Sequence, residues 1–341
     1  LPNVSGTLPV LAVASTTAIT STPEELNIID GGTSASTVTV ADADRVVLND
    51  GGTMKQVAVT SLAAYFDDEI TAMPNLVTVG AANTLTTVAG IPFYQGDSGS
   101  IYTHDVSGTD STATSNTAFG ITAMDAITTG DNNTAVGTSA LGANNSGGNN
   151  VAVGSAAMIT NTTGANNTAV GFEALYSNTT AGHNTAIGIQ ALKLNIGGAN
   201  TAVGRLALTA NTTGADSVAV GANAMEANTT GGNNTSVGES SMKANTTGAN
   251  NTAVGNDALL AGTTGTSNTA LGKAALAAVT TTSNSTAIGY GALTANTGAN
   301  NTALGYNAAA ANTSGVRNLA IGYQAYDASD TENDNIAIGY A

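Results

Sequence analysis

The sequence predicts an all-β fold: an elongated β-solenoid or β-roll of about 14 coils that associates into a trimer, preceded by a small mixed α/β region. Three observations lead to this prediction. A pentapeptide related to Asn-Thr-Ala-Val-Gly recurs along the chain, its spacing is 17 residues, and the apolar residues are mostly Ala and Val among 41 Gly. A fixed short period indicates a repeat architecture in which each unit packs only on its neighbours.

The last residue of the pentapeptide, which we call the motif glycine, defines the register of the repeat. It recurs after 17 residues at every step except two, which are 16 residues long. The spacing therefore predicts one coil per period, with the glycine at a fixed place in the coil. The repeat glycines are Gly137, Gly154, Gly171, Gly188, Gly204, Gly221, Gly238, Gly255, Gly272, Gly289, Gly305 and Gly322, with further copies at Gly120 and Gly339.

The residue before each motif glycine is always apolar, so we expect it to face the inside of the coil. A small residue and a Leu or Met, three and four positions after the glycine, would pack beside it. The predicted repeat core comprises Val136, Val153, Val170, Ile187, Val203, Val220, Val237, Val254, Leu271, Ile288, Leu304, Ile321 and Ile338.

The residue types within one period predict its local structure. Thr-Ala-Val-Gly alternates as a strand does, so Thr134 and Val136 face one way and Ala135 and Gly137 the other. The Ala-Leu pair that follows predicts a second short strand or extended segment. Asn-Thr-Thr-Gly-Ala-Asn, as at 161–166, predicts an outward turn with stacked Asn side chains, because Gly and Asn tolerate positive φ. Helical repeats need about 33 residues or more and fewer helix breakers.

The small size of the apolar residues predicts association. One Val, one Leu and two Ala per coil supply about 4–6 kcal/mol of transfer free energy, which is less than the cost of ordering the coil. We therefore expect a homotrimer, in which apolar residues on the two sides of the strand are buried inside the coil and at a three-fold interface.

The residues before the repeat divide by composition. Asn49-Asp50-Gly51-Gly52 predicts a hairpin turn between Arg45–Leu48 and Met54–Val59. A Thr or Ser can cap a short helix over 60–73 that ends before Pro74. The expected divisions are an extended attachment segment (1–43), a hairpin-helix collar (44–74), an irregular transition or cap (75–115) and the repeat shaft (116–341).

The charge balance excludes several classes of partner. With 7 Lys and Arg against 23 Asp and Glu, the net charge of −16 repels phosphate backbones and anionic headgroups, so nucleic acid is not an expected partner. We expect no membrane insertion, because the chain has no run of about 20 apolar residues. Leu1-Pro2-Asn3 lacks the pattern of a signal peptide, and Leu1 in place of Met suggests a processed or partial chain.

The sequence offers little material for catalysis or metal binding. It has no Cys, and its two His, His104 and His183, lie among turn residues, where solvated loop positions are the expectation. We therefore predict no enzyme, no cofactor, no metal and no catalytic residue.

Two acidic groups are the exceptions to weigh. The carboxylates of 67–69 and those of Asp327, Asp330, Glu332 and Asp334 could form a glycosidase pair, and the second group could form an oxygen-rich cation site. We interpret both groups as solvated charges. Rows of Thr are also typical of ice-binding solenoids, but here the Thr pairs fall in predicted turns.

The repeated N-T-A-V-G-x-x-A-L and N-T-A-I-G units over residues 116–341 resemble the head repeats of trimeric autotransporter adhesins and of phage tail fibres. Segments 21–31 and 44–66 are similar to modules of marine phage tail-fibre and virion structural proteins. The resemblance implies a trimeric left-handed parallel β-roll, although those adhesin heads usually have a period a few residues shorter.

The same resemblance implies a function. We expect a virion structural fibre, a tail-fibre shaft that supports host attachment, with its N-terminal region on other virion tail proteins and a host glycan or protein as a further partner. A C-terminal chaperone removed after trimer assembly would also follow from it. The alternative is a trimeric adhesin on a bacterial cell surface. An ice-binding solenoid or a glycan-cleaving tailspike ranks below both.

Overall fold

The computed structural model describes residues 45–50, 53–58, 87–88, 91–92, 94–95, 101–102, 112–328 and 331–340. The chain divides into two units, residues 1–81 and 82–341, which are taken one at a time below. All regular secondary structure in the described residues is β-strand. The fold is therefore all-β, and the helix expected over 60–73 lies outside the described residues.

The first unit contains an antiparallel hairpin. Strands β1 (Arg45–Asp50) and β2 (Thr53–Ala58) pair from Arg45↔Ala58 to Asp50↔Thr53. Two glycines separate the paired ends, which is the connection that a tight hairpin requires. The hairpin lies where the sequence predicts it.

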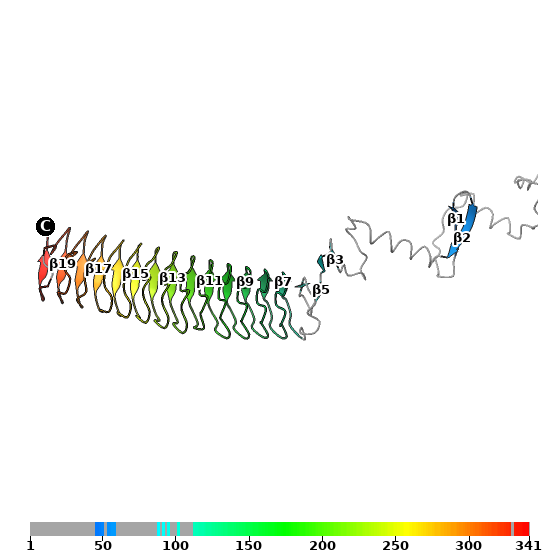
Figure 1. The fold of residues 1–341 in the computed structure, drawn as a ribbon, viewed down its shortest axis with the longest axis horizontal. Helices are drawn as coiled ribbons and strands as arrows, with labels where there is room; N and C mark the ends of the chain where they lie inside the picture. The colour runs from blue at the N-terminus through cyan, green and yellow to red at the C-terminus, as the bar shows by residue number, and fades with distance from the viewer. Residues whose placement is uncertain are drawn as a thin grey trace, which may run out of the picture. The chain divides into compact units, whose positions relative to one another are not determined.

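The second unit contains a parallel β-solenoid with one three-residue strand in each repeat (Figure 1). Each strand pairs in register with its equivalent in the next coil, for example Ala169↔Ala186. The fourteen strands mark thirteen successive turns of chain. They are β7 (Thr117–Phe119), β8 (Thr134–Val136), β9 (Val151–Val153), β10 (Thr168–Val170), β11 (Thr185–Ile187), β12 (Thr201–Val203), β13 (Val218–Val220), β14 (Thr235–Val237), β15 (Thr252–Val254), β16 (Thr269–Leu271), β17 (Thr286–Ile288), β18 (Thr302–Leu304), β19 (Leu319–Ile321) and β20 (Ile336–Ile338).

Short strands precede the first coil. β3 (Thr87–Val88) and β4 (Ile91–Pro92) form a two-stranded antiparallel sheet. β5 (Tyr94–Gln95) pairs antiparallel with β6 (Ile101–Tyr102), and β6 then pairs parallel with β7. The backbone edge of β7 that faces away from the other coils is thus hydrogen-bonded rather than open.

The interior of each coil is thin and only partly apolar. The middle residue of the strand points inward, as Ala135 does, and meets the small residue and the Leu or Met that follow the motif glycine, here Ala140 and Leu141. Most coils also place two asparagines in this interior, and Asn133 and Asn144 are both at most 1% exposed. Such a narrow layer has room for alanine methyl groups and one larger side chain.

One row of buried asparagines stands immediately before the strands. The Asn133 side-chain amide donates to the carbonyl of Gly147 at 2.9 Å, and its Oδ1 accepts the backbone N–H of Asn150 at 3.0 Å. Asn150 makes the same two bonds with the following coil, to Gly164 and Asn167. Each asparagine therefore links its own coil to the next and satisfies its buried polar atoms.

A second row of asparagines lies seven residues after the motif glycine. The amide of Asn161 donates to Oδ1 of Asn144 at 2.8 Å and to the carbonyl of Gly164 at 3.0 Å. The asparagine ladders that the sequence predicts are present, but they are buried. We expected the Asn-Thr-Gly segments to face outward, and for their asparagines this expectation is wrong. The asparagines are buried because their amides must hydrogen-bond the backbone carbonyl groups inside these tight bends.

The motif glycines occupy a conformation that no other residue adopts easily. From Gly120 to Gly322 their φ angles lie between +129° and +142°. A Cβ placed on Gly154 would lie 2.5 Å from the carbonyl oxygen of Gly171 in the next coil. The positive φ angle requires glycine at this position, and so does the close approach of the next coil's backbone.

The second strand expected around the Ala-Leu pair is absent. The chain turns there instead: Ala140 N–H donates back to the Gly137 carbonyl at 3.2 Å, and Ser139 and Leu141 have φ of 57° and 51°. Left-handed angles exclude a strand and disfavour β-branched side chains. This explains why the position of Leu141 is Leu, Met, Ala or Tyr in every described coil and never Val or Ile.

Candidate functional site

The outward side of the sheet is the most distinctive surface of the solenoid. It consists of the first and third residues of β7 to β20, which we call the strand face. These residues flank the buried middle residue, so their side chains point away from the coil interior, as in Thr168 and Val170 on either side of Ala169. Thr134 and Val136 point to one side of the strand and Ala135 to the other, as predicted. The prediction placed Val136 in the core, whereas the structure places Ala135 there.

The apolar residue before the motif glycine is therefore not the core of a single coil. Val136 is 37% exposed, Leu271 46% and Ile338 70%, and no member of this column is buried. The physical reason is space: the thin interior takes Ala at the middle of the strand, which places the bulkier neighbour outside. The correction applies to Val136, Val153, Val170, Ile187, Val203, Val220, Val237, Val254, Leu271, Ile288, Leu304, Ile321 and Ile338.

The strand face carries no charge along its whole length. Its first positions are Thr, Val, Leu or Ile, and its third positions are Val, Ile, Leu or Phe119. The charged residues of the coils lie elsewhere, chiefly one, two or five residues after a motif glycine. Thirteen steps of about 4.8 Å and a width of about 10 Å give this uncharged strip of Thr and aliphatic side chains an area of about 600 Å².

Directly after each motif glycine comes a position that is exposed in most coils and half-buried at Ala222 and Asn256, which we call the post-glycine position. In the last four coils it is Tyr290, Tyr306, Tyr323 and Tyr340, and we call this set the tyrosine ladder. Neighbouring rings are stacked with centroids 5.3, 5.2 and 5.1 Å apart and planes within 12° of parallel. Although stacked, the first three side chains remain 44–49% exposed and Tyr340 is 82% exposed.

Sequence reasoning missed the tyrosine ladder. A signal was available, since Tyr follows the motif glycine in four successive copies. Equal positions in successive coils lie one strand spacing apart, which places flat rings in stacking range.

Elsewhere the post-glycine position varies in character. In the middle of the solenoid it holds Arg205, Glu239 and Lys273, two coils apart and alternating in sign. Nearer the N-terminal end of the solenoid it holds Phe172 and Ile189, which are 47% and 52% exposed.

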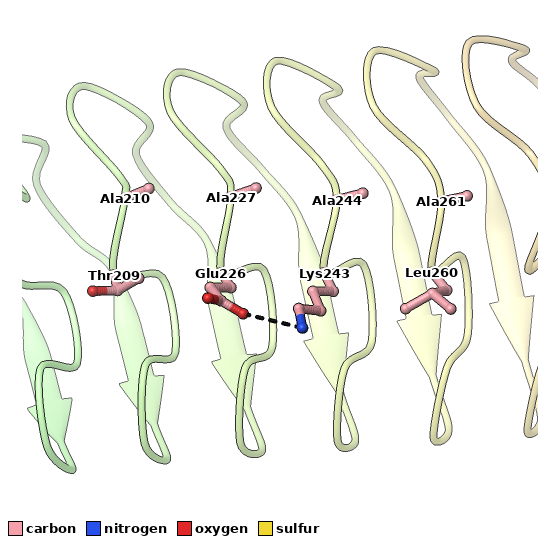
Figure 2. Close-up of a pocket in the computed structure, with 8 residues that line it drawn as sticks. All are labelled: Thr209, Ala210, Glu226, Ala227, Lys243, Ala244, Leu260 and Ala261. Carbon is pink, nitrogen blue, oxygen red and sulfur yellow. Dashed lines mark ion pairs between the residues drawn. The ribbon is translucent and has the colours of Figure 1, made fainter.

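An open groove runs along another side of the coils (Figure 2). Its volume is about 550 Å³, and alanine methyl groups make up much of its wall. Glu226 and Lys243 on neighbouring coils form an ion pair of 3.5 Å along it. The lining residues are Thr209, Ala210, Glu226, Ala227, Lys243, Ala244, Leu260 and Ala261. The two charged groups in the groove thus neutralise one another.

A tighter ion pair links two other coils. Lys193 Nζ lies 2.6 Å from Oε2 of Glu173, and Gln190 donates to the same oxygen at 2.8 Å. The hydrogen bond from Lys193, followed by that from Gln190, holds the pKa of the Glu173 carboxyl below its ordinary value. Such pairs connect one coil to the next across the surface.

Those titratable residues singled out in the sequence that the structure describes do not form a common cluster. His183 is exposed in a turn with φ of 62°, whereas His104 lies outside the described residues. Arg317 donates to both carboxylate oxygens of Asp334, and this hydrogen bonding lowers the pKa of Asp334. Among the residues with described positions, no three His, Asp or Glu side chains gather as a metal site would need.

The other acidic residues are only partly described. Asp330 and residues 67–69 lie outside the described residues. The described segments of the chain include no helix suited to spanning a lipid bilayer.

The threonines of the turns use their hydroxyl groups within the solenoid. Thr212 Oγ1 donates to the Thr229 carbonyl at 2.9 Å, and Thr229 Oγ1 donates to the Thr246 carbonyl at 3.0 Å. These rows of threonine therefore strengthen the stacking of the coils.

Comparisons of the chain with protein-family models, with curated proteins and with solved structures find no match.

Proposed function

We propose that the chain is a structural fibre protein, the shaft of a phage tail fibre that supports attachment to a host cell, built from three copies of the chain. The observation that carries the proposal is an uninterrupted parallel solenoid whose outward strand face is free of charge over all fourteen strands and carries a large apolar residue at the third position of each. Buried amide ladders, inter-coil backbone bonds and surface ion pairs all act along the axis, which suits an element that must hold its length.

The strand face supports self-association. Its area of about 600 Å² approaches the ~800 Å² that each partner contributes to a standard protein interface. A partner that meets every coil must repeat at the same axial spacing. A second copy of this chain, lying parallel, meets that condition at all fourteen strands without burying a charge.

The proposal gives the chain no catalytic role. Several charged groups of the coils pair between neighbours, as Glu226 does with Lys243 and Glu173 with Lys193, and these pairs serve the solenoid rather than a substrate. Repeated identical surfaces suit a spacer, and host recognition belongs in this proposal to the ends of the fibre. The resemblance of the repeats to tail fibres and adhesin heads supports the same reading.

Charge placed on the strand face tests the association. The double change Val220→Asp and Val237→Asp adds carboxylates to two adjacent outward positions, whereas Thr230→Asp and Thr247→Asp add them to two exposed turn positions. We expect the first protein to sediment as a monomer with unchanged circular dichroism and the second to keep the mass of the native assembly. If both variants keep that mass, the strand face is not the interface.

The cellular role is tested by fractionation of the source that encodes the chain. Mass spectrometry of purified virions is expected to detect it, at a constant ratio to other tail proteins. Recovery from the outer-membrane fraction of uninfected cells instead would replace the tail fibre by the bacterial surface adhesin.

A further inference from the structure

In a trimer of near-identical coils, the strand face alone does not determine how far one copy is displaced along the axis relative to the next. Along the strand face every coil presents a Thr or aliphatic residue and, except for Phe119 in the first coil, a Val, Ile or Leu. A copy displaced by one coil would therefore meet almost the same chemistry and lose only one coil of contact. Uniform strands specify their register weakly for this reason.

The two short repeats do not remove this ambiguity. Across each of them the strands pair without a break, as Thr185↔Thr201 and Thr286↔Thr302 show. The missing residue is taken up in the turns, beside Asn195 and Asn296, away from the sheet. The strand face is thus the same at these coils as elsewhere.

The post-glycine position does differ along the axis. It lies two residues beyond the third residue of the strand, and Tyr290, Tyr306 and Tyr323 there are 44–49% exposed. In the proposed assembly, a long side chain at this position contacts the copy packed on the strand face. The tyrosine ladder occupies it in the last four coils, where half-exposed rings stack at 5.1–5.3 Å. The adjacent strand face is also most apolar there, with Leu319 and Ile336 in place of the usual Thr.

We propose that the tyrosine ladder fixes the axial register between the parallel copies of the chain, an inference that rests on the proposed trimeric shaft. In register, the four rings of each copy lie level with the four rings of its neighbours. A displacement of one coil sets Tyr290 of one copy level with the ammonium group of Lys273 of the next and leaves a Tyr340 ring beyond the end of its neighbour's ladder.

The charged post-glycine residues make such a device necessary. In register, Arg205 lies level with Arg205 and Glu239 with Glu239 of the neighbouring copies, which is electrostatically unfavourable. A displacement of two coils sets Arg205 level with Glu239, and Glu239 with Lys273, which is favourable. The ladder opposes this stagger, because it would leave two rings of each copy without a counterpart.

Disulfide cross-linking measures the register directly, because the chain has no Cys of its own. Val220→Cys cross-links to itself when copies are level. In mixed assemblies it cross-links to Val237→Cys after a one-coil stagger and to Val254→Cys after a two-coil stagger, since a disulfide spans only about 3.5–4.5 Å between Cβ atoms. The full chain is co-refolded with each partner, oxidised and analysed by mass.

The test compares a Tyr→Ser triple variant at Tyr290, Tyr306 and Tyr323 with the matched Tyr→Phe triple. The native chain and the Phe variant are expected to give the 220–220 product. In the Ser variant the ratio of level to staggered product is expected to fall at least about tenfold, which corresponds to about 1.4 kcal/mol. Excess product is expected at the two-coil stagger, and it should decline as salt is added.

Each other outcome has a distinct meaning. A native trimer whose Ser variant cross-links only at 220–220 overturns the register assignment and leaves the trimeric shaft intact. A trimeric native chain whose Ser variant is monomeric also overturns it, because the ladder would then be needed for association itself. A monomeric native chain overturns the proposed trimer and the inference together.

Discussion

Replacing a motif glycine by alanine is expected to damage the solenoid far more than replacing a turn glycine. Gly154 has φ of +137°, and an added Cβ would lie 2.5 Å from the Gly171 oxygen and 2.7 Å from its carbon. Ordinary contact requires about 3.5 Å, so the two coils would separate locally by about 1 Å. The bond from Gly171 N–H to the Val153 carbonyl, now 2.8 Å, would not survive this shift.

The expected cost follows from these two effects. A non-glycine residue in this region of φ costs about 1–3 kcal/mol, and each inter-coil hydrogen bond lost costs about 1 kcal/mol. Gly154→Ala should therefore destabilise the protein by about 2–4 kcal/mol. Gly148→Ala is the matched control: its Cβ would lie 3.2 Å from the Asp131 oxygen, and the next coil carries Ala165 at this place. We expect the control to stay within about 1 kcal/mol of the native chain.

The measurement is guanidinium unfolding followed by circular dichroism at one protein concentration, together with hydrogen exchange resolved by peptide. Exchange is needed because long repeat arrays can unfold in parts. Gly154→Ala is expected to lower the unfolding midpoint and to lose protection first in the coils on either side of residue 154. Equal midpoints for the two variants would refute the reasoning from coil spacing.

Three further changes probe other parts of the coil. Asn228→Ala removes a buried amide that donates to Asn211 Oδ1 at 2.8 Å and to the Gly231 carbonyl at 3.0 Å, and it also removes the acceptor of one of the two bonds from the Asn245 amide. Two buried acceptors lose this donor, so a loss of about 3–5 kcal/mol on guanidinium unfolding is expected; a loss under about 1 kcal/mol would show that the ladder is dispensable. Leu208→Ile should lower the thermal midpoint clearly more than Leu208→Met, because its φ of 51° disfavours a β-branched residue; equal midpoints would argue for an extended backbone there. Lys193→Met should raise the pKa of Glu173 in an NMR titration. Because that pKa is depressed in the folded protein, the ion pair contributes stability above the ordinary glutamate pKa and loses it as the pH falls through the folded value, so an unmoved titration would count against the pair.

The period, the strand residues and the turn positions could be predicted because they depend on local chemistry. Alternation within Thr-Ala-Val-Gly defines a strand, and Asn, the commonest residue at the end of the turn, tolerates the positive φ observed there, as at Asn166. Which side of the strand faces the core could not be decided from hydrophobicity, since Ala135 and Val136 are both apolar. The usable signal is uniformity of size: the middle residue is Ala in every strand but β14, whereas the next residue ranges from Val to Phe119.

Two other features depend on contacts between coils. The asparagine ladders were expected, but their burial follows from the backbone carbonyls inside the bends, which the sequence does not display. The turn after the motif glycine was mistaken for a strand because Ala and Leu suit either structure. The absence of Val and Ile at the position of Leu141 was the available sign of left-handed φ.

The mass of the native assembly tests the central claim most directly. The chain has a mass of 33.2 kDa, so sedimentation equilibrium of the full-length protein is expected to give three times that value, about 100 kDa, at all concentrations measured. A particle of 33.2 kDa that remains folded would show that the apolar strand face stays exposed to water. That result would contradict the proposal that this solenoid is one of three chains in a trimeric shaft.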